Sequence, residues 1–228
     1  HPMVEEAKEA VGSMGDDTPS AVLSDKYRPL SHFFRQNFSQ VTNPAIDSLR
    51  ENEVMSLKTR FGNLGNILDF KNLTQDNIYV LESPILSNSQ FEKFKIFFKN
   101  DLKVLDCTFD LKNNLKKRLE ELCSEAEIAV REGCKHLILS DKKISEKEAA
   151  IPMILVFGAI NSRLVNLGIR GFVSINVQTA EVLDTHSFAV LLGVGATTIN
   201  PYLAFDSIYQ RYEKKLFGKF SYEECIQR

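Results

Sequence analysis

The stretch HLILSD, residues 136–141, has the short and almost continuously apolar pattern of a buried β-strand. After a polar connection comes PMILVFGAINSRLVNLG, residues 152–168, whose apolar side chains recur at helical spacing. Pro152 suits the first turn of a helix, and Gly168 suits the position just beyond its C-terminal end. The two segments predict one strand–helix unit. This unit decides the fold, because the same alternation recurs on both sides of it.

The alternation extends through most of the chain beyond residue 71. The expected strands are residues 77–85, 103–109, 136–141, 171–179 and 196–200. The expected helices are residues 89–100, 115–133, 152–168, 184–195 and 201–216. Strands that alternate with helices indicate an α/β fold with βα units and a mainly parallel sheet. Since an eight-stranded barrel takes about 200 residues or more, these units predict a partial barrel or an open sheet.

Two of the expected helices have distinct apolar faces. The long helix at 115–133 carries a small-to-medium apolar stripe made of Leu115, Leu119, Leu122, Ala126 and Ala129. The helix at 89–100 is expected to carry four aromatic side chains on one side, namely Phe91, Phe94, Phe97 and Phe98.

The N-terminal part of the chain has a different pattern. Residues 1–25 are acidic, small and turn-rich, so we expect an extended segment. In residues 26–70 one helix is expected to end near Thr42 and another to begin at Pro44, because the residue before proline is pushed out of the helical region. The sequence therefore predicts a helix–corner–helix segment at 26–70, which precedes the βα-repeat portion at 71–228.

Composition limits the classes of function. The chain has 228 residues, 43% of them hydrophobic and 25% charged, and a formal net charge of −2, which is ordinary for a globular protein. It has no basic block of the kind that binds nucleic acid, so we expect no nucleic-acid partner. Its apolar runs are too short for a membrane span, and its N-terminus has no signal-peptide pattern, so we expect a cytoplasmic protein. The four cysteines lack metal-ligand spacing and predict neither a metal site nor a redox motif.

The loops after the strands offer little recognisable chemistry. Ser140 and Asp141 follow a strand and could orient a ligand, but capping of the next turn is the favoured interpretation. His186 lies at a strand-to-helix loop and is the histidine with the most suitable place for a ligand contact. The sequence contains no Walker A motif, no nucleophile elbow and no HExxH motif. The residues alone therefore predict an α/β domain without an identifiable catalytic constellation.

Several longer stretches carry a resemblance to a known family. They are GSMGDDTPSAVLSD (12–25), FRQNFSQVTNPAIDSLRENEVMSL (34–57), HLILSD (136–141), AAIPMILVFGAI (149–160) and THSFAVLLGVGATTINPYLA (185–204). In this order they closely resemble the central domain of the large subunit of glutamate synthase. The resemblance extends over nearly the whole chain.

The resemblance implies a fold similar to a reduced TIM barrel and a noncatalytic role. In the family, this domain links a glutamine amidotransferase domain to an FMN-binding synthase domain of the same chain, and it helps to form the ammonia tunnel. The full-length enzyme makes glutamate from glutamine and 2-oxoglutarate. FMN and an iron–sulfur cluster are expected there, together with a small electron-transfer subunit. No cofactor is expected in this chain itself.

The corner after the first predicted helix supplies candidates for the tunnel or for a domain interface. They are Thr42, Asn43, Asp47, Arg50 and Glu51, whose polar groups could line a narrow path or fix an alignment by ion pairs. A purely structural corner is the alternative for these residues. For the whole chain the alternative is an autonomous α/β domain that binds a phosphorylated ligand such as FMN. Such a domain would use Ser140, Asp141 and His186.

Overall fold

The protein is described here by a computed structural model, in which residues 2–7, 21–34, 55–62, 68 and 78–228 are described. The chain falls into two units, one comprising residues 1–35 with 86–228 and the other residues 36–85. The domain boundaries predicted at residues 25 and 70 stay predictions.

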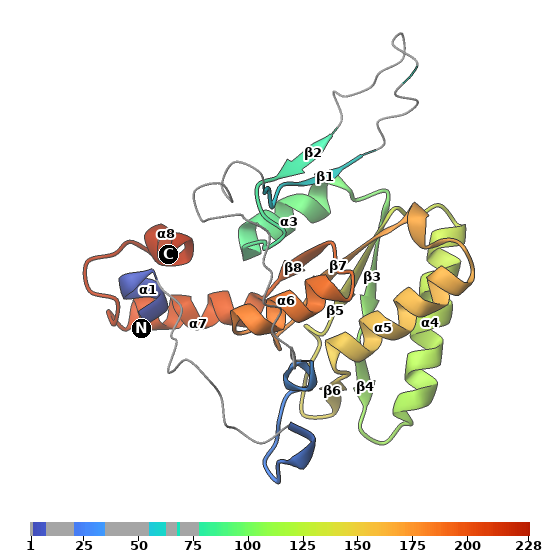
Figure 1. Ribbon diagram of the computed structural model, residues 1–228, viewed down its shortest axis with the longest axis horizontal. Helices are drawn as coiled ribbons and strands as arrows, with labels where there is room; N and C mark the ends of the chain where they lie inside the picture. The colour runs from blue at the N-terminus through green and yellow to red at the C-terminus, as the bar shows by residue number, and fades with distance from the viewer. Residues whose placement is uncertain (1, 8–20, 35–54, 63–67, 69–77) are drawn as a thin grey trace, which may run out of the picture. The chain divides into compact units, whose positions relative to one another are not determined.

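The larger unit is built on a four-stranded parallel sheet (Figure 1). Its strands, in spatial order, are β3 (Leu102–Asp106), β5 (His136–Ser140), β7 (Ser174–Gln178) and β8 (Thr198–Asn200). Spatial neighbours follow one another along the chain, so each crossover steps in the same direction. The helices are α4 (Leu115–Arg131), α5 (Met153–Asn166), α6 (Thr185–Gly193) and α7 (Tyr202–Glu213), with the short η4 (Arg170–Phe172) before β7. The predicted α/β fold with a mainly parallel sheet is confirmed.

The first predicted strand, residues 77–85, does not join this sheet. Its centre forms β2 (Tyr79–Leu81), which pairs antiparallel with β1 (Thr59–Phe61) in the smaller unit. Val80 is exposed whereas Leu81 is buried, which is the pattern of a strand with one buried face. The prediction of a fifth parallel βα unit was therefore wrong. Within the described residues the parallel sheet is open, and no barrel closure is found.

The predicted strand at 103–109 is broken at Cys107. β3 ends before it, and β4 (Thr108–Asp110) begins after it and pairs antiparallel with β6 (Glu148–Ala150). The Cys107 N–H donates to the carbonyl of Ser140 at 2.8 Å, and the Ile151 N–H donates to the carbonyl of Cys107 at 3.0 Å. Cys107 is thus the point at which the chain passes from the parallel sheet to a second, two-stranded one.

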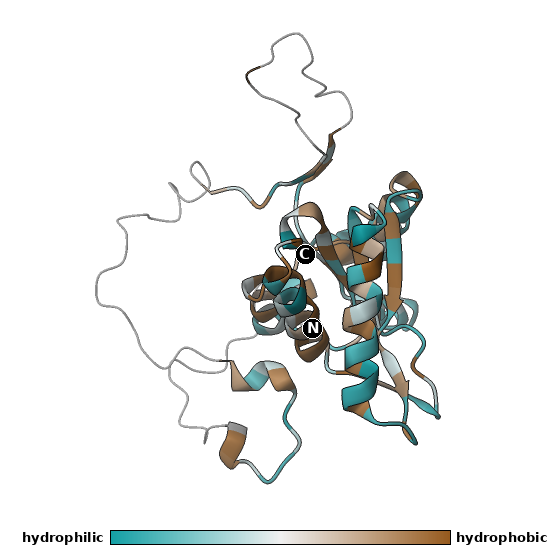
Figure 2. Cartoon of the chain, turned by 90° about the vertical axis from the view of Figure 1, so that its right-hand side faces the viewer, coloured by the Kyte–Doolittle hydropathy of each residue, from teal (hydrophilic) through white to brown (hydrophobic). Residues whose placement is uncertain are grey.

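One face of the parallel sheet is apolar and packs on helices. In one register row across the strands lie Leu105, Leu139, Val177 and Ile199, all within the main hydrophobic core. The predicted stripe of α4 is confirmed, because Leu122, Ala126 and Ala129 are buried, and Leu115 and Leu119 pack against the core. The side of α4 that faces the viewer in Figure 2 is largely hydrophilic. α4 is therefore amphipathic in the way that its sequence predicts.

Aromatic side chains of α3 (Asn88–Phe97) lie against His136, which points away from that apolar face. The rings of Phe98 and His136 lie 4.0 Å apart, and those of Phe94 and His136 lie 5.8 Å apart, between centroids. Phe91, Phe94 and Phe98 are buried but Phe97 is exposed, so the four phenylalanines expected on one side of the helix do not share one environment. Phe97 lies three residues after Phe94, where the helix is already ending.

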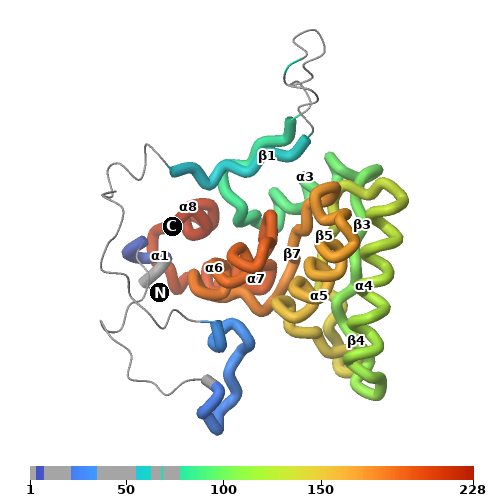
Figure 3. The backbone as a smooth tube through the Cα atoms, turned by 45° about the vertical axis from the view of Figure 1, so that its right-hand side comes forward, coloured from blue at the N-terminus to red at the C-terminus, as the bar shows by residue number. Residues whose placement is uncertain are grey.

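Short helices form the remaining described parts of the larger unit. They are α1 (Pro2–Glu6), η1 (Ala21–Leu23), η2 (Leu30–Phe33) and α8 (Tyr222–Gln227). Val4 packs with Phe217 and Cys225, and Arg228 donates to the carbonyl of Val4 at 2.7 Å, so the two chain ends lie side by side (Figure 3). No helix among the described residues has the length and apolar character that a membrane crossing needs.

Candidate functional site

The residues predicted for an ammonia tunnel or a domain interface cannot be placed. They are Thr42, Asn43, Asp47, Arg50 and Glu51, and all of them lie outside the described residues. Their roles stay predictions. The other sequence candidates, Ser140, Asp141 and His186, lie in the larger unit near the carboxyl ends of its strands, and their contacts are described below.

A row of polar side chains crosses the sheet at the carboxyl ends of the strands. Ser140 Oγ donates to Gln178 Oε1 at 2.9 Å, and Gln178 Nε2 donates to Asn200 Oδ1 at 3.1 Å. The three residues come from β5, β7 and β8, which the parallel register sets side by side. All three are buried. The hydroxyl of Ser140 therefore donates its hydrogen bond within the protein.

The row continues beyond the edge of the sheet. Asn200 Nδ2 donates to the carbonyl of Leu86 at 3.0 Å and to Asn88 Oδ1 at 2.9 Å. Asn88 Nδ2 in turn donates to Asp206 Oδ1 at 3.1 Å. These contacts fix the start of α3 to β8 and to α7. The row thus joins elements that lie more than one hundred positions apart in sequence.

A second polar row lies on the same face of the sheet, two to four residues earlier on the strands. Thr198 Oγ1 donates to Asn176 Oδ1 at 2.7 Å, and Asn176 Nδ2 donates to Ser174 Oγ at 3.0 Å. Ser174 Oγ lies 2.8 Å from His136 Nδ1. Burial lowers the pKa of His136 to about 4, so its ring is neutral near pH 7.

Sequence reasoning missed both rows, although a signal was present. Ser174, Asn176 and Gln178 alternate with apolar residues along β7, and Thr198 and Asn200 do the same along β8. Period-two spacing places such residues on one face of a sheet. A buried parallel sheet is expected to be apolar on both faces, which is why the pattern was read only as a strand.

Asp141 is completely buried and binds the next strand–helix loop. Its carboxylate accepts from Thr179 Oγ1 at 2.6 Å and from the Ala180 N–H at 3.0 Å, and the hydroxyl of Tyr202 also donates to it. Burial raises the pKa of Asp141, although these hydrogen bonds oppose the shift. Its position holds together the loops after β5, β7 and β8.

Carboxylates occupy the N-terminal ends of two helices at this edge of the sheet. Glu181 Oε2 accepts from the Met153 N–H at 2.9 Å, at the first residue of α5. Asp184 is the N-cap of α6 and accepts from the Ser187 N–H at 2.8 Å. Phosphate groups bind at such helix ends because the N–H groups and the helix dipole attract anions. A phosphorylated ligand would here meet a carboxylate at each of the two helix ends.

His186 contacts the N-terminal part of the chain. Its Nε2 lies 2.9 Å from the carbonyl of Ser31, and since a carbonyl only accepts, the ring donates. Ser31 is buried and belongs to η2. His186 therefore fixes η2 to the first turn of α6.

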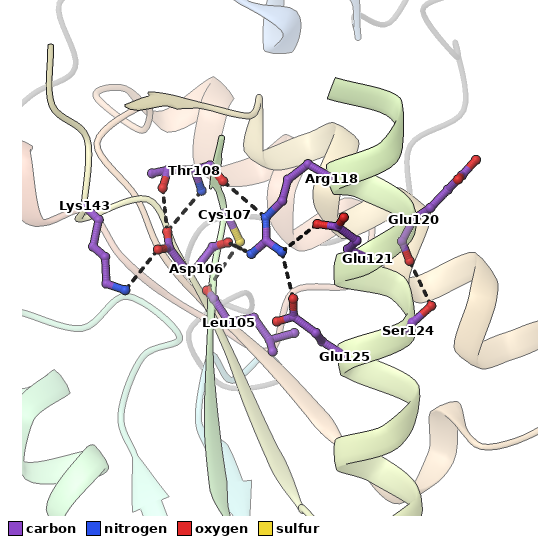
Figure 4. A network of polar contacts seen from close by, with 10 residues as sticks. All are labelled: Leu105, Asp106, Cys107, Thr108, Arg118, Glu120, Glu121, Ser124, Glu125 and Lys143. Atoms are coloured by element: carbon purple, nitrogen blue, oxygen red, sulfur yellow. Dashed lines mark hydrogen bonds and ion pairs between the residues drawn. The ribbon is translucent and has the colours of Figure 1, made fainter. Parts of the chain in front are cut away.

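A polar network surrounds the break between β3 and β4 (Figure 4). Arg118 of α4 donates to the carbonyl of Asp106 at 2.8 Å, more weakly to that of Thr108 at 3.4 Å, and to Glu125 Oε1 at 2.7 Å. Asp106 accepts from the Thr108 hydroxyl at 2.8 Å and pairs with Lys143 at 3.0 Å. Burial alone would raise the pKa of Asp106, but the Thr108 and Lys143 contacts outweigh it and lower the pKa.

A surface hollow of about 520 Å³ borders this network. Acidic and basic side chains are mixed along its wall, so the hollow favours neither sign of charge in a ligand. The charged residues are Asp106, Asp110, Lys117, Arg118, Glu121, Lys143 and Glu148. Within the described part of the chain, no group of three or more His, Cys, Asp or Glu side chains could hold a metal ion.

The sequence is similar to that of known proteins. A family model described as glutamate synthase central domain matches residues 1–227. The chain is similar to the NADPH glutamate synthase large chain of Azospirillum brasilense, with 54% identity over 98% of this chain and 15% of that relative. The corresponding protein of Bacillus subtilis is 39% identical over 100% of this chain and 15% of its own length. The ferredoxin-dependent glutamate synthase of Spinacia oleracea is 41% identical over 91% of this chain and 13% of its own length. This chain thus spans about one seventh of the length of these relatives.

Proposed function

The chain belongs to the glutamate synthase central domain family, and from this premise we propose that it is the noncatalytic linking domain of a glutamate synthase large chain. In this role it connects a glutamine amidotransferase domain with an FMN-binding synthase domain of the same polypeptide. It also forms part of the path of ammonia, during synthesis of glutamate from glutamine and 2-oxoglutarate. The enzyme functions in the cytoplasm in this proposal.

The cofactors of this enzyme belong to other parts of the assembly. FMN and the iron–sulfur cluster lie in the synthase domain, and a small subunit delivers electrons to it. The central domain holds no cofactor of its own. Its contribution is to position the two catalytic domains and to enclose the intermediate between them.

The observation that carries the noncatalytic role is the carboxylate at each of two helix ends. Glu181 and Asp184 each accept from one N–H group at a helix end of the kind that binds phosphate in a flavin-binding α/β domain. Asp141 and Ser140 are engaged with neighbouring loops. Within the described residues, every fully buried side-chain nitrogen or oxygen has a partner. These contacts support a structural use of the strand ends over an autonomous phosphate site.

The sheet is a reduced form of a TIM barrel in this proposal. Support comes from the strand order β3-β5-β7-β8. Each strand of this sheet lies parallel to, and beside, the strand that comes before it in the chain, as in a barrel. The polar rows would then correspond to the barrel interior. Phe94 of α3 and Phe98, the residue after its last, lie against His136 and fill part of that space.

The ammonia path is tested at the predicted corner. Thr42 and Asn43 are proposed to line the path, and Asp47, Arg50 and Glu51 to fix the neighbouring domain by ion pairs. Asn43→Leu in the full-length large chain should lower the glutamine-dependent rate by about tenfold, or about 1.4 kcal/mol, and leave the ammonia-dependent rate nearly unchanged. Asn113→Leu, at an exposed turn before α4, is the matched control. An equal loss of both rates in Asn43→Leu would contradict the proposed role of Asn43 in the ammonia path.

A further inference from the structure

Residues 21–34, here called the strap, are attached to the larger unit by one side (blue in Figure 3). The carbonyl of Ser31 accepts from His186 at the first turn of α6, and Ser31 is buried. Leu30 packs against the main hydrophobic core. η1 and η2 also contact each other. The position of the strap on this unit is therefore defined by its own contacts.

The other side of the strap presents large apolar side chains to solvent. Tyr27 is 90% exposed and Leu23 is 76% exposed. The exposed apolar residues of the strap are Val22, Leu23, Tyr27, Phe33 and Phe34. Leu183, which is also exposed, precedes α6 at the end where the strap is attached. Single exposed apolar residues are ordinary, but such a density in one short segment is typical of a contact surface.

The charges of the strap favour a protein surface as the partner of this patch. Asp25, Lys26 and Arg28 lie among the apolar residues, so both signs of charge are present. A nucleic acid or an anionic membrane would require a cluster of basic residues. Aromatic and aliphatic side chains with mixed charges around them are the usual composition of a protein interface.

The length of the relatives supports another domain of the same polypeptide as the partner. The chain spans 13–15% of the glutamate synthases that it matches, so most of each relative lies outside the matched segment. We propose that the exposed side of the strap is the docking surface for another domain of the same polypeptide. This inference rests on the proposed function, and it specifies where the linking domain contacts a neighbour. His186 and Ser31 hold the strap in place for this contact.

The test places a photocrosslinker on the strap in the full-length large chain. Tyr27→p-benzoylphenylalanine keeps an aromatic side chain at a position with ample space. After irradiation, mass spectrometry of the digested protein identifies the peptide that is crosslinked. The expected partner is a peptide of the same polypeptide outside residues 1–228. Phe172→p-benzoylphenylalanine is the matched control, because Phe172 is also an exposed aromatic residue and lies in η4, away from the strap in sequence.

Three results would overturn the inference. Crosslinks confined to residues 1–228 would show that the patch is covered from within this chain. Crosslinks between two copies, which disappear on dilution, would show self-association. A yield at Tyr27 no higher than at Phe172 would show that the strap is not a preferred contact. Because the readout requires no activity, it can fail or succeed independently of the ammonia role tested at Asn43.

Discussion

The buried carboxylate of Asp141 accepts a hydrogen bond from the hydroxyl of Thr179 at 2.6 Å. This contact joins the loop after β5 to the loop after β7. The same carboxylate also accepts from the Ala180 N–H. The acidic residue best placed to orient a ligand at the strand ends is thus committed to holding loops together.

Removal of this carboxylate should destabilise the domain. Asp141→Ala leaves the Thr179 hydroxyl and the Ala180 N–H without their acceptor in a buried place, so the free energy of unfolding should fall by about 1–3 kcal/mol. Urea denaturation at neutral pH measures it. Asp25→Ala, at an exposed aspartate, should change stability by less than about 0.5 kcal/mol. Equal effects of the two substitutions would contradict the structural role of Asp141.

Gln178 is the centre of the polar row across the sheet. Gln178→Leu removes a donor and an acceptor at once. The Ser140 hydroxyl then lacks its acceptor and Asn200 Oδ1 lacks its donor, which should cost about 2–4 kcal/mol of unfolding free energy. Ser140→Ala removes the hydroxyl that Gln178→Leu leaves without an acceptor. The double variant should therefore lose less unfolding free energy than the sum of the two single losses. A double-mutant cycle by urea denaturation measures the coupling. Strict additivity would mean that the row is not cooperative.

Arg118 stabilises the break between β3 and β4 through its planar, many-donor head group. Arg118→Lys keeps the charge but cannot contact the carbonyls of Asp106 and Thr108 together with Glu125, so we expect a loss of about 1–2 kcal/mol in thermal or urea unfolding. The control is Arg131→Lys, since Arg131 is a largely exposed partner of Glu127. Its effect should lie near zero. An unchanged unfolding free energy in Arg118→Lys would show that only the charge of Arg118 contributes to stability.

His136 should make stability depend on pH. Its pKa in the folded state is about 4, below the ordinary value of 6.5, because burial disfavours the charged ring. The unfolded chain therefore takes up the proton first, and stability that is present above pH 6.5 is lost as the pH falls toward 4. The full loss of unfolding free energy is about 3 kcal/mol.

The pH contribution of His136 is isolated by comparison with a variant. Unfolding free energies of the wild type and His136→Gln are measured by urea denaturation at several values between pH 7 and 4. The difference between them should shrink as the pH falls, because only the wild type carries the histidine penalty. A constant difference across this range would refute the assignment.

The repeating part of the fold was predictable because its signals are local. The apolar run of HLILSD and the proline and glycine at the ends of the next helix predict β5 and α5 closely. The pairing of β2 with β1 was not predictable from the strand pattern, which is the same for parallel and antiparallel partners. Nor does any local pattern connect Asn200 with Leu86, which lie 114 positions apart.

The candidate site was predicted less well than the fold. Ser140, Asp141 and His186 were singled out by their place after strands, yet their partners depend on side-chain direction and on distant segments. The polar faces of β7 and β8 could have been found from alternation alone. Thr42 and Asn43 rest on the resemblance and on the proline corner, and they stay predictions.

The central claim is that the strand ends of this domain hold the fold together and bind no flavin. An FMN titration of the purified chain, followed by flavin fluorescence and thermal shift together, tests it most directly. We expect no saturable change, because Glu181 and Asp184 each place a carboxylate at a helix end that a phosphate would need. Saturable binding with a micromolar or tighter Kd, lost in Ser140→Ala or Asp141→Asn, would contradict it.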